Sequence, residues 1–349
     1  MSRLERALAL VAIPSVSRHE AAIAAFVERA LHENSSLEVE RVGDNVVART
    51  TGMHATRLLV AGHLDTVPGD ASMAAIVGDH LLGVGACDMK GSLAVMLELA
   101  GDPTPRPVEV TWIFYAREEI SRAESGLLEL AELRPDLIQA DAVVLAEPTG
   151  GAVEAGCQGS MRVEVTLRGE RAHTARPFAG RNAIHRLGDL LARVASYEPR
   201  VVDVGGVTFT EQLQAVLVDG GVAANVVPDE AHCTLNHRVA PDRTRDEASA
   251  WLRGFLAETL EEGDEFEVAD WAPPAPPSLE NDRLVDLVAR AGGQVRAKVG
   301  WTDVATFAAL GVPATNFGAG DPHLAHRSDE FVTGAELDEF ARVLGEWLG

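Results

Sequence analysis

The chain has 349 residues, of which 46% are apolar and 24% charged, a composition that excludes a disordered, collagen-like or coiled-coil protein. Its length is more than twice the roughly 150 residues of a typical domain and predicts two domains, and no apolar run reaches the roughly 18 residues of a membrane span. The net charge of −23 repels phosphate backbones and anionic lipids, so we expect neither a nucleic-acid nor a membrane partner.

The N-terminal residues are predicted to belong to the fold. The apolar stretch at residues 7–13 is short and follows Glu5, which argues against a signal peptide. Ser17 and Glu20 have the spacing of a capping box and predict a helix from Ala21 to Leu31. A cytoplasmic location follows as the default. The three cysteines lack CxxC spacing, which argues against a disulfide framework or a zinc-thiolate site.

Residues 1–157 alternate short apolar strands with helical segments. The strands are predicted at 58–61, 108–115 and 141–146, and the helices at 92–100 and 125–133. This alternation is typical of an α/β fold, in which helices flank a sheet.

The pattern changes near Gly159, where residues 162–167 begin to alternate as a strand with one solvated face does. The elements predicted next are strands at 214–218 and 232–236 and helices at 182–194 and 245–260. A proline-rich linker at 272–277 precedes a helix at 282–291 and a strand at 313–317. We therefore predict one α/β domain, residues 1–157 and 272–349, interrupted by an inserted α+β domain with an antiparallel sheet at 158–271.

Polar side chains follow the predicted strands of the α/β domain at the points where those strands end. They are His63 and Asp65, Glu118 and Glu119, Glu147, and, after the strand at 313–317, His323 and His326; Asp88 lies in the glycine-bounded loop 83–91. In open α/β sheets, sites form beyond the carboxyl ends of the strands. We therefore expect these side chains to converge on one edge of the sheet.

Imidazole and carboxylate groups in this number suit a pair of zinc-like ions, which a shared carboxylate can bridge. Asp65, two residues after His63, is better placed to orient the imidazole than to ligate beside it. One of Glu118 and Glu119 can ligate while the other reaches the attacking water. Each motif alone has a simpler explanation: an acidic pair often lies in a solvated turn, and Asp88 can cap a helix. The coincidence of four such motifs in one domain favours the metal site.

At this point the sequence resembles a known family. The stretches 62–68, 83–91, 117–119 and 147–149 match, in order, the signatures of the M20 family of co-catalytic zinc peptidases and amidohydrolases. The resemblance covers essentially the whole chain. Within the family, the stretches 154–159, 171–176, 225–228 and 326–330 are most similar to the succinyl-diaminopimelate desuccinylases of actinobacteria. The family implies a zinc-peptidase-like mixed sheet flanked by helices, with an inserted α+β lid domain that forms a homodimer.

The resemblance also implies roles for individual residues. Two Zn²⁺ ions, with Co²⁺ or Mn²⁺ as substitutes, would be held by His63, Asp88 and Glu147 and by Asp88, Glu119 and His326. His326 is preferred to His323 because it precedes the family's Asp-Glu pair at 329–330. Asp65 would orient His63, and Glu118 would be the general base. The residues implied to contact the substrate are His173, reaching the partner subunit's site, Asn225, Arg238 and, in a looser match beside Trp301, Thr302.

The activity implied is metal-dependent hydrolysis of the amide bond of a small N-acyl amino acid, N-succinyl-L,L-diaminopimelate, to succinate and L,L-diaminopimelate. Three alternatives stay open. The chain can act on another acyl group or amine, as an acetylornithine deacetylase, a carboxypeptidase or a dipeptidase does. It can be a non-catalytic metal-binding or scaffold protein, although the presence of Glu118 argues against this. It can be a nucleotide-binding α/β enzyme, although a phosphate loop is missing from the sequence.

Overall fold

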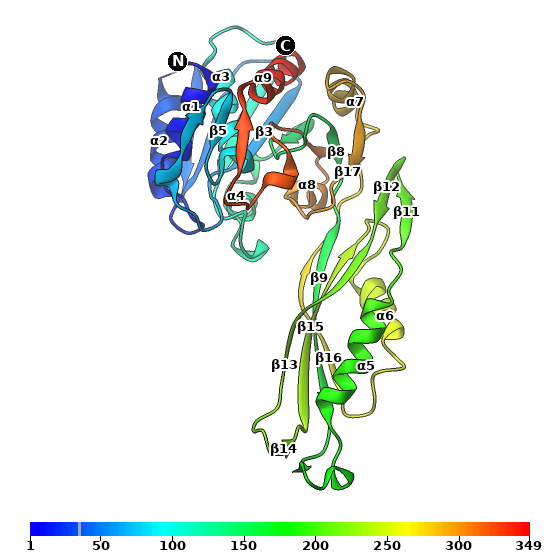
Figure 1. Cartoon of the computed structure of the whole chain (residues 1–349). Helices are drawn as coiled ribbons and strands as arrows, with labels where there is room; N and C mark the ends of the chain where they lie inside the picture. The colour runs from blue at the N-terminus through cyan, green and yellow to red at the C-terminus, as the bar shows by residue number, and fades with distance from the viewer. Residues whose placement is uncertain (34–35) are drawn as a thin grey trace. The chain divides into compact units, whose positions relative to one another are not determined.

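The computed structural model describes residues 1–33 and 36–349, which divide into two compact units (Figure 1). Unit 1 comprises Met1–Gly156, Pro277–Arg296 and Thr302–Gly349, and unit 2 comprises Cys157–Pro276 and Ala297–Trp301. Among the described residues, no helix is long and apolar enough to cross a membrane.

Unit 1 is built around an eight-stranded mixed sheet with the strand order β1-β2-β6-β3-β7-β18-β8-β17. Neighbouring β6, β3, β7 and β18 run parallel, whereas β2 is antiparallel to β1 and β6, and β8 is antiparallel to β18. The strands are β1 (Leu37–Val42), β2 (Asn45–Thr50), β3 (Arg57–His63), β6 (Glu109–Tyr115), β7 (Ala142–Leu145), β8 (Val153–Ala155), β17 (Val295–Ala297) and β18 (Ala314–Asn316).

The central strands are buried on both faces, which explains why their sequences are continuous apolar runs. Leu58 and Val60 are fully buried, and so are Leu59 and Ala61, which point to the opposite face of β3. Helix α3 (Gly91–Gly101) packs against β3 and β6. A Cβ atom on Gly62 would lie 2.7 Å from the side chain of Leu93, so glycine is required for this close approach one residue before His63.

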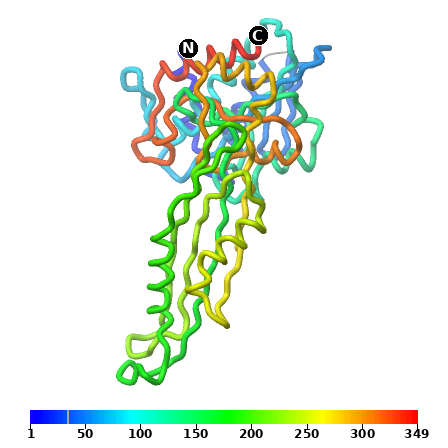
Figure 2. The backbone as a smooth tube through the Cα atoms, turned by 90° about the vertical axis from the view of Figure 1, so that its right-hand side faces the viewer, coloured from blue at the N-terminus to red at the C-terminus, as the bar shows by residue number. Residues whose placement is uncertain are grey.

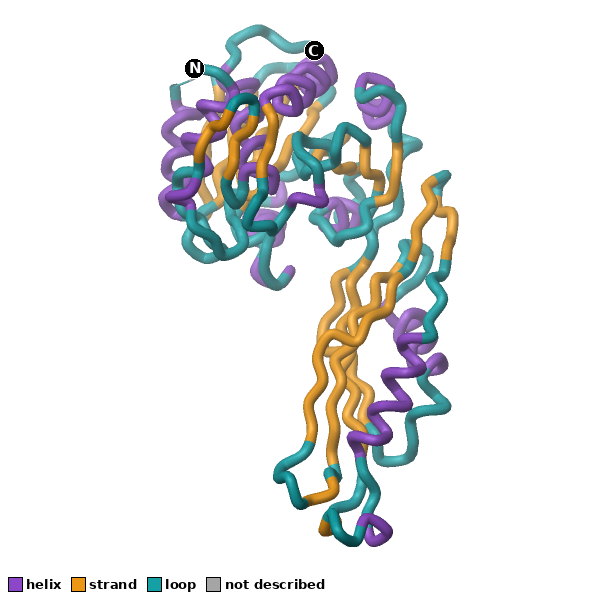
Figure 3. The backbone as a smooth tube through the Cα atoms, viewed as in Figure 1, coloured by secondary structure: helices purple, strands orange, loops and turns teal. Residues whose placement is uncertain are grey.

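Helices and a second small sheet complete unit 1 (Figure 3). The longer helices are α1 (Arg3–Val11), α2 (Ala21–His32), α4 (Gly126–Leu133), α7 (Asp282–Arg290), α8 (Val304–Ala309) and α9 (Gly334–Leu348), and the small sheet contains β4 (Ala75–Val77), β5 (His80–Leu82) and β19 (Phe331–Thr333). The predicted capping box before α2 is wrong. Glu20 itself is the N-cap and makes no side-chain capping bond, and the Ser17 hydroxyl donates to Asp65 instead.

Unit 2 contains a four-stranded antiparallel sheet with the order β13-β15-β9-β16. Its strands are β9 (Gly159–Arg168), β13 (Gln212–Gly220), β15 (Glu230–Val239) and β16 (Glu265–Ala272), and short pairs are formed by β10 (Ala172–His173) with β14 (Val226–Val227) and by β11 (Val201–Val204) with β12 (Val207–Thr210). Figure 2 shows helices α5 (Ala183–Ala195) and α6 (Arg245–Phe255) along this sheet.

The predicted helix at 245–260 is too long, because α6 ends at Phe255. Leu256 continues the apolar period of the helix and is fully buried, but the chain has already left the helix through hydrogen-bonded turns. A buried leucine in a turn gives the same sequence pattern as a buried leucine in a helix. Strands β11, β12 and β16 were not predicted.

Candidate metal centre

The four parallel strands of unit 1 bring their carboxyl ends, and the polar residues that follow them, to the same edge of the sheet. His63 ends β3 and pairs in register with Tyr115, the last residue of β6. Glu118 and Glu119 follow β6, and Glu147 follows β7, whose Leu145 aligns with Ala61 of β3. The residues placed after separate strands in the sequence therefore meet in one place.

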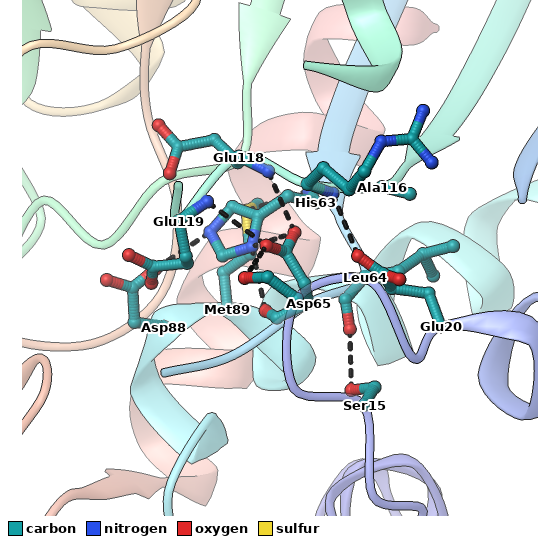
Figure 4. Close-up of polar contacts among 12 residues, drawn as sticks. Ser15, Glu20, His63, Leu64, Asp65, Asp88, Met89, Ala116, Glu118 and Glu119 are labelled. Atoms are coloured by element: carbon teal, nitrogen blue, oxygen red, sulfur yellow. Dashed lines mark hydrogen bonds and ion pairs between the residues drawn. The ribbon is translucent and has the colours of Figure 1, made fainter. Parts of the chain in front are cut away.

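Asp88 lies between two histidines at this edge. One carboxylate oxygen, Oδ1, is 3.0 Å from Nε2 of His63, and the other, Oδ2, is 3.6 Å from Nε2 of His326. Nε2 of His326 is also 3.0 Å from Oε1 of Glu119, and Nε2 of His63 is 4.0 Å from Oε1 of Glu147. Potential ligand atoms of His63, Asp88 and Glu119 lie within 4.8 Å of one another (Figure 4). A carboxylate placed between two imidazoles has the arrangement needed to bridge two cations.

The hydrogen bond at the far side of His63 determines which ring nitrogen faces Asp88 without a proton. Nδ1 lies 3.0 Å from the backbone carbonyl oxygen of Asp65, and a carbonyl can only accept. Nδ1 therefore carries a proton, and whenever the ring is neutral it presents a lone pair at Nε2 to the carboxylate of Asp88. Two facing acceptors repel each other unless a proton or a cation lies between them, so the pair fits a metal ion.

Asp65 contacts both His63, which the family resemblance implies that it orients, and the backbone of the segment after β6. Its Oδ1 is 3.6 Å from Nδ1 of His63, longer than a hydrogen bond. The same carboxylate accepts hydrogen bonds from the N–H groups of Glu118 and Glu119, at 3.0 and 3.1 Å, and from the Ser17 hydroxyl at 2.7 Å. Burial opposes ionisation, but His63 and these donors outweigh it and lower the pKa of Asp65 to about 2.

Asp88 is held by a residue that the sequence analysis used only as a motif marker. Glu330 is buried, and its Oε1 accepts the N–H groups of Cys87 and Asp88, at 2.8 and 2.9 Å. The peptide bond after Asp88 is cis. Asp88 does not cap α3, whose N-cap is Lys90, and the Lys90 ammonium donates to the carbonyl of Ile13. The sequence feature that could have identified Glu330 as a functional residue is its position in the Asp-Glu pair that follows His326.

Acidic groups dominate the electrostatics of this edge. Burial, followed by the charge of Glu147, raises the pKa of Glu118 well above its usual value. The hydrogen bond to Glu119 is the main cause that raises the pKa of His326 to about 9. Burial alone would lower the pKa of His63, but Asp65 and Asp88 raise it well above its usual value. A half-enclosed group of carboxylates that raises the pKa values of its neighbours is a site that favours bound cations.

The remaining predicted residues are not members of the group of potential ligand atoms formed by His63, Asp88 and Glu119. His323 is largely exposed, and its ring bonds to Asp321. Thr302 is buried in unit 1, and its hydroxyl donates to the side-chain oxygen of Asn316. The predicted substrate residues His173, Asn225 and Arg238 lie in unit 2.

Within unit 2, His173 and Asn225 are neighbours, since the N–H of Thr174 donates to the carbonyl of Asn225. They lie beyond the Glu230 end of β15, whereas Arg238 is near the opposite end of that strand. Eight residues of strand correspond to roughly 26 Å. His173 thus lies beyond one end of the four-stranded sheet, and Arg238 lies near its other end.

Comparison with known proteins agrees with this architecture. The profile of the family described as Peptidase family M20/M25/M40 matches residues 59–348. A Mycobacterium tuberculosis protein named, provisionally, succinyl-diaminopimelate desuccinylase is 46% identical over 99% of this chain and 98% of its own length. A Corynebacterium glutamicum protein named succinyl-diaminopimelate desuccinylase is 41% identical over 97% of this chain and 94% of its own length.

Solved structures share the fold at low identity. A Staphylococcus aureus tripeptidase has a TM-score of 0.81 at 20% identity, covering 99% of this chain and 96% of that one. A Bacillus subtilis protein described as a dinuclear metal binding peptidase from the M20 family has a TM-score of 0.69 at 18% identity, covering 99% and 96%. The family match over residues 59–348 and the relatives above 40% identity establish that this chain belongs to peptidase family M20/M25/M40 and is a hydrolase of that family.

Proposed function

We propose that the protein hydrolyses the amide bond of N-succinyl-L,L-diaminopimelate at a two-metal centre. The observation that carries the proposal is the position of Asp88 between His63 and His326. The carboxylate of Glu118 lies close enough to His63 and Glu147 for their charges to act on it. His63, Asp88 and Glu147 would hold one ion, and Asp88, Glu119 and His326 the other. The mixture of imidazole and carboxylate donors suits Zn²⁺, with Co²⁺ or Mn²⁺ as substitutes. When bound, such a pair of ions polarises a carbonyl and lowers the pKa of water.

Glu118 is the general base of the proposed reaction. Its carboxylate takes a proton from the attacking water as the water oxygen bonds to the amide carbon, and it returns that proton to the nitrogen as the C–N bond breaks. The products are a carboxylate and a free amine. Burial and the charge of Glu147 raise the pKa of Glu118, which favours acceptance of a proton from the attacking water.

His173 would stabilise the oxyanion of the tetrahedral intermediate. Its Nδ1 lies 3.0 Å from the N–H of Ala175 and accepts that hydrogen bond, so the proton of the neutral ring is on Nε2. The exposed ring therefore presents a donor, as an oxyanion requires. Asn225, its neighbour, would add a second polar contact.

Arg238 would bind the α-carboxylate of the substrate. It is partly buried, and the described residues include no acidic partner for its guanidinium. Since His173 lies beyond one end of the four-stranded sheet and Arg238 near its other end, a single substrate cannot contact both groups of the same chain. We therefore assign His173 and Asn225 to the active site of the partner subunit in a homodimer.

The edge strand β13 supports the same assembly. It lies at the edge of the sheet of unit 2, and three successive apolar residues, Val216, Leu217 and Val218, are 50%, 68% and 57% exposed. A long apolar edge strand is an aggregation hazard unless another chain covers it. We expect sedimentation analysis to show a dimer, and a purely monomeric, active protein would refute this assignment.

The names of the two relatives favour the succinyl substrate over other members of the family. The acyl carboxylate of this substrate would lie near Thr302. An acetyl group lacks this carboxylate, and a polar site left unpaired costs on the order of 1–3 kcal/mol, or about 10- to 100-fold in discrimination.

The test is a comparison of kcat/KM for succinyl-diaminopimelate, acetylornithine and a dipeptide, using zinc-loaded protein, with Glu118→Gln as the inactive control. We expect succinyl-diaminopimelate to be preferred over acetylornithine by at least about 10-fold. Equal rates, or a preference for acetylornithine or the dipeptide, would refute the substrate while leaving a metal-dependent amidohydrolase or peptidase.

A further inference from the structure

Two of the three non-glycine residues with positive φ among the described residues depend on one buried carboxylate. Arg18 has φ 73° and precedes α2, and Arg117 has φ 63° and directly precedes Glu118. Oε1 of Glu20 accepts the N–H of Arg18 at 3.0 Å and the N–H of Arg117 at 3.1 Å. Left-handed backbone is unfavourable for residues with a Cβ atom, so both conformations need external support.

The Glu20 carboxylate has no role in its own helix. Glu20 is the N-cap of α2, but its side chain makes no capping hydrogen bond, and the first turn is closed by its backbone carbonyl, which accepts the N–H of Ala24. Glu20 is fully buried. A buried carboxylate is costly unless it is hydrogen-bonded. Of the two bonds that Oε1 accepts, one comes from Arg18, two residues away, and the other from Arg117, 97 residues away in the sequence. Oε2 has no hydrogen-bond partner among the described residues.

Glu20 and Asp65 together hold three consecutive amides. The N–H of Arg117 donates to Glu20, and the N–H groups of Glu118 and Glu119 donate to the two oxygens of Asp65. Figure 4 shows Glu20 and Asp65 on the same side of the segment that carries Glu118 and Glu119. The backbone that bears the proposed base and a proposed ligand is thereby anchored at every residue.

We propose that Glu20 is a positioning residue for Glu118: by holding the left-handed turn at Arg117, it sets the direction in which the Glu118 carboxylate leaves the end of β6. This inference rests on the proposed role of Glu118 as the base. It predicts that removal of the Glu20 carboxylate affects turnover more than substrate binding, because Glu20 itself does not touch the substrate.

The chain offers a matched control in Glu109, at the opposite end of the same strand. Glu109 is also buried, and its carboxylate accepts the Thr50 hydroxyl and the N–H groups of Gly52 and His54. It therefore anchors a loop in the same chemical manner but far along β6 from Glu118. Glu20→Met and Glu109→Met remove the same acceptor from two ends of one strand.

The experiment measures kinetics and amide hydrogen exchange for Glu20→Met, Glu20→Gln and Glu109→Met. We expect Glu20→Met to lower kcat about 10- to 100-fold, the usual cost of losing a residue that orients a catalytic group, with KM little changed. Glu20→Gln, whose amide oxygen can still accept both N–H groups, should retain most of the turnover. Glu109→Met should retain kcat in the folded protein.

Hydrogen exchange in the metal-free protein separates this inference from the proposed function, because it needs no activity. Amides 117–119 should exchange faster in Glu20→Met and not in Glu109→Met, whereas amides 52–54 should show the reverse. Unchanged exchange at 117–119 in Glu20→Met, or an equal loss of kcat in Glu20→Met and Glu109→Met, would overturn the inference. If Glu20→Met does not fold, the shortened Glu20→Asp must give the same exchange pattern, and its failure to do so would also overturn it.

Discussion

Replacement of Asp65 by asparagine tests whether a single carboxylate holds the segment that carries the proposed base. The carboxylate accepts three hydrogen bonds, from the N–H groups of Glu118 and Glu119 and from the Ser17 hydroxyl. Asparagine keeps the shape but has one oxygen, so whichever way the amide is turned, one backbone N–H of the pair faces an NH₂ group. A buried donor left without its acceptor costs about 1–3 kcal/mol.

The pKa of Asp65 reflects the same hydrogen bonds together with the neighbouring His63, and it gives a magnitude of the same order. Lowering of the pKa from 3.8 to about 2 corresponds to about 2 kcal/mol of stability in the metal-free protein. Because the folded-state pKa is the lower one, this stability is present above about pH 4 and is lost as the pH falls through about 2. At pH 7 the full contribution should therefore be missing in Asp65→Asn.

The assay combines denaturant unfolding of the metal-free protein at pH 7 with steady-state kinetics of the metal-loaded protein. We expect the free energy of unfolding to fall by about 2 kcal/mol and kcat to fall about 10- to 100-fold. Glu109→Gln, a buried carboxylate at the other end of β6, should lose stability but keep kcat. A stable and fully active Asp65→Asn protein would show that the amides of Glu118 and Glu119 do not need this anchor.

Three further predictions concern the proposed metal centre and dimer. Chelation should abolish hydrolysis, and Zn²⁺ should restore it. Among the ligand substitutions, Asp88→Ala should be the most damaging because it removes a bond to each ion. Near-normal activity of the metal-free Asp88→Ala protein would contradict the proposed site. The Glu118→Gln variant should keep both ions and lose several orders of magnitude in turnover, whereas the Glu119→Gln variant should lose affinity for one ion. If metal analysis shows the opposite, the proposed roles of Glu118 and Glu119 must be exchanged. Mixing His173→Ala subunits with Glu118→Gln subunits should restore activity, because a heterodimer contains one active site in which both groups are intact. If activity does not return after verified subunit exchange, His173 acts in the active site of its own chain or has a structural role.

The sequence predicted the central strands well because their chemistry is local. Strands β3, β6 and β7 are largely apolar, and the polar residues at or just after their ends mark the carboxyl edge of the sheet. His63, the last residue of β3, and Glu147, two residues after β7, were found in this way. The strand order did not have to be predicted in order to locate the site, because parallel strands in one sheet have their carboxyl ends at the same edge.

The residues that support the site were missed because their contacts are long-range. Ser17 and Glu20 have the spacing of a capping box, and nothing local distinguishes a serine that caps a helix from one that bonds to Asp65 across 48 positions. Glu330 contacts the amide of Asp88 from 242 positions away. Such bonds become visible only when the fold has brought the segments together, so a local pattern predicts the ligands better than it predicts what orients them.

The geometry of unit 2 explains why one chain alone cannot supply all the substrate contacts of the proposed reaction. The β-sheet of unit 2 separates His173 from Arg238 by roughly 26 Å, whereas the carbonyl and the α-carboxylate of one substrate are only a few bonds apart. A flexible loop cannot bridge this distance, because His173 belongs to β10, which is paired in register with β14, and Arg238 belongs to β15, which is paired on both sides. Both residues can serve one substrate only if they come from different chains, and the exposed apolar edge of β13 is where a second chain would pair.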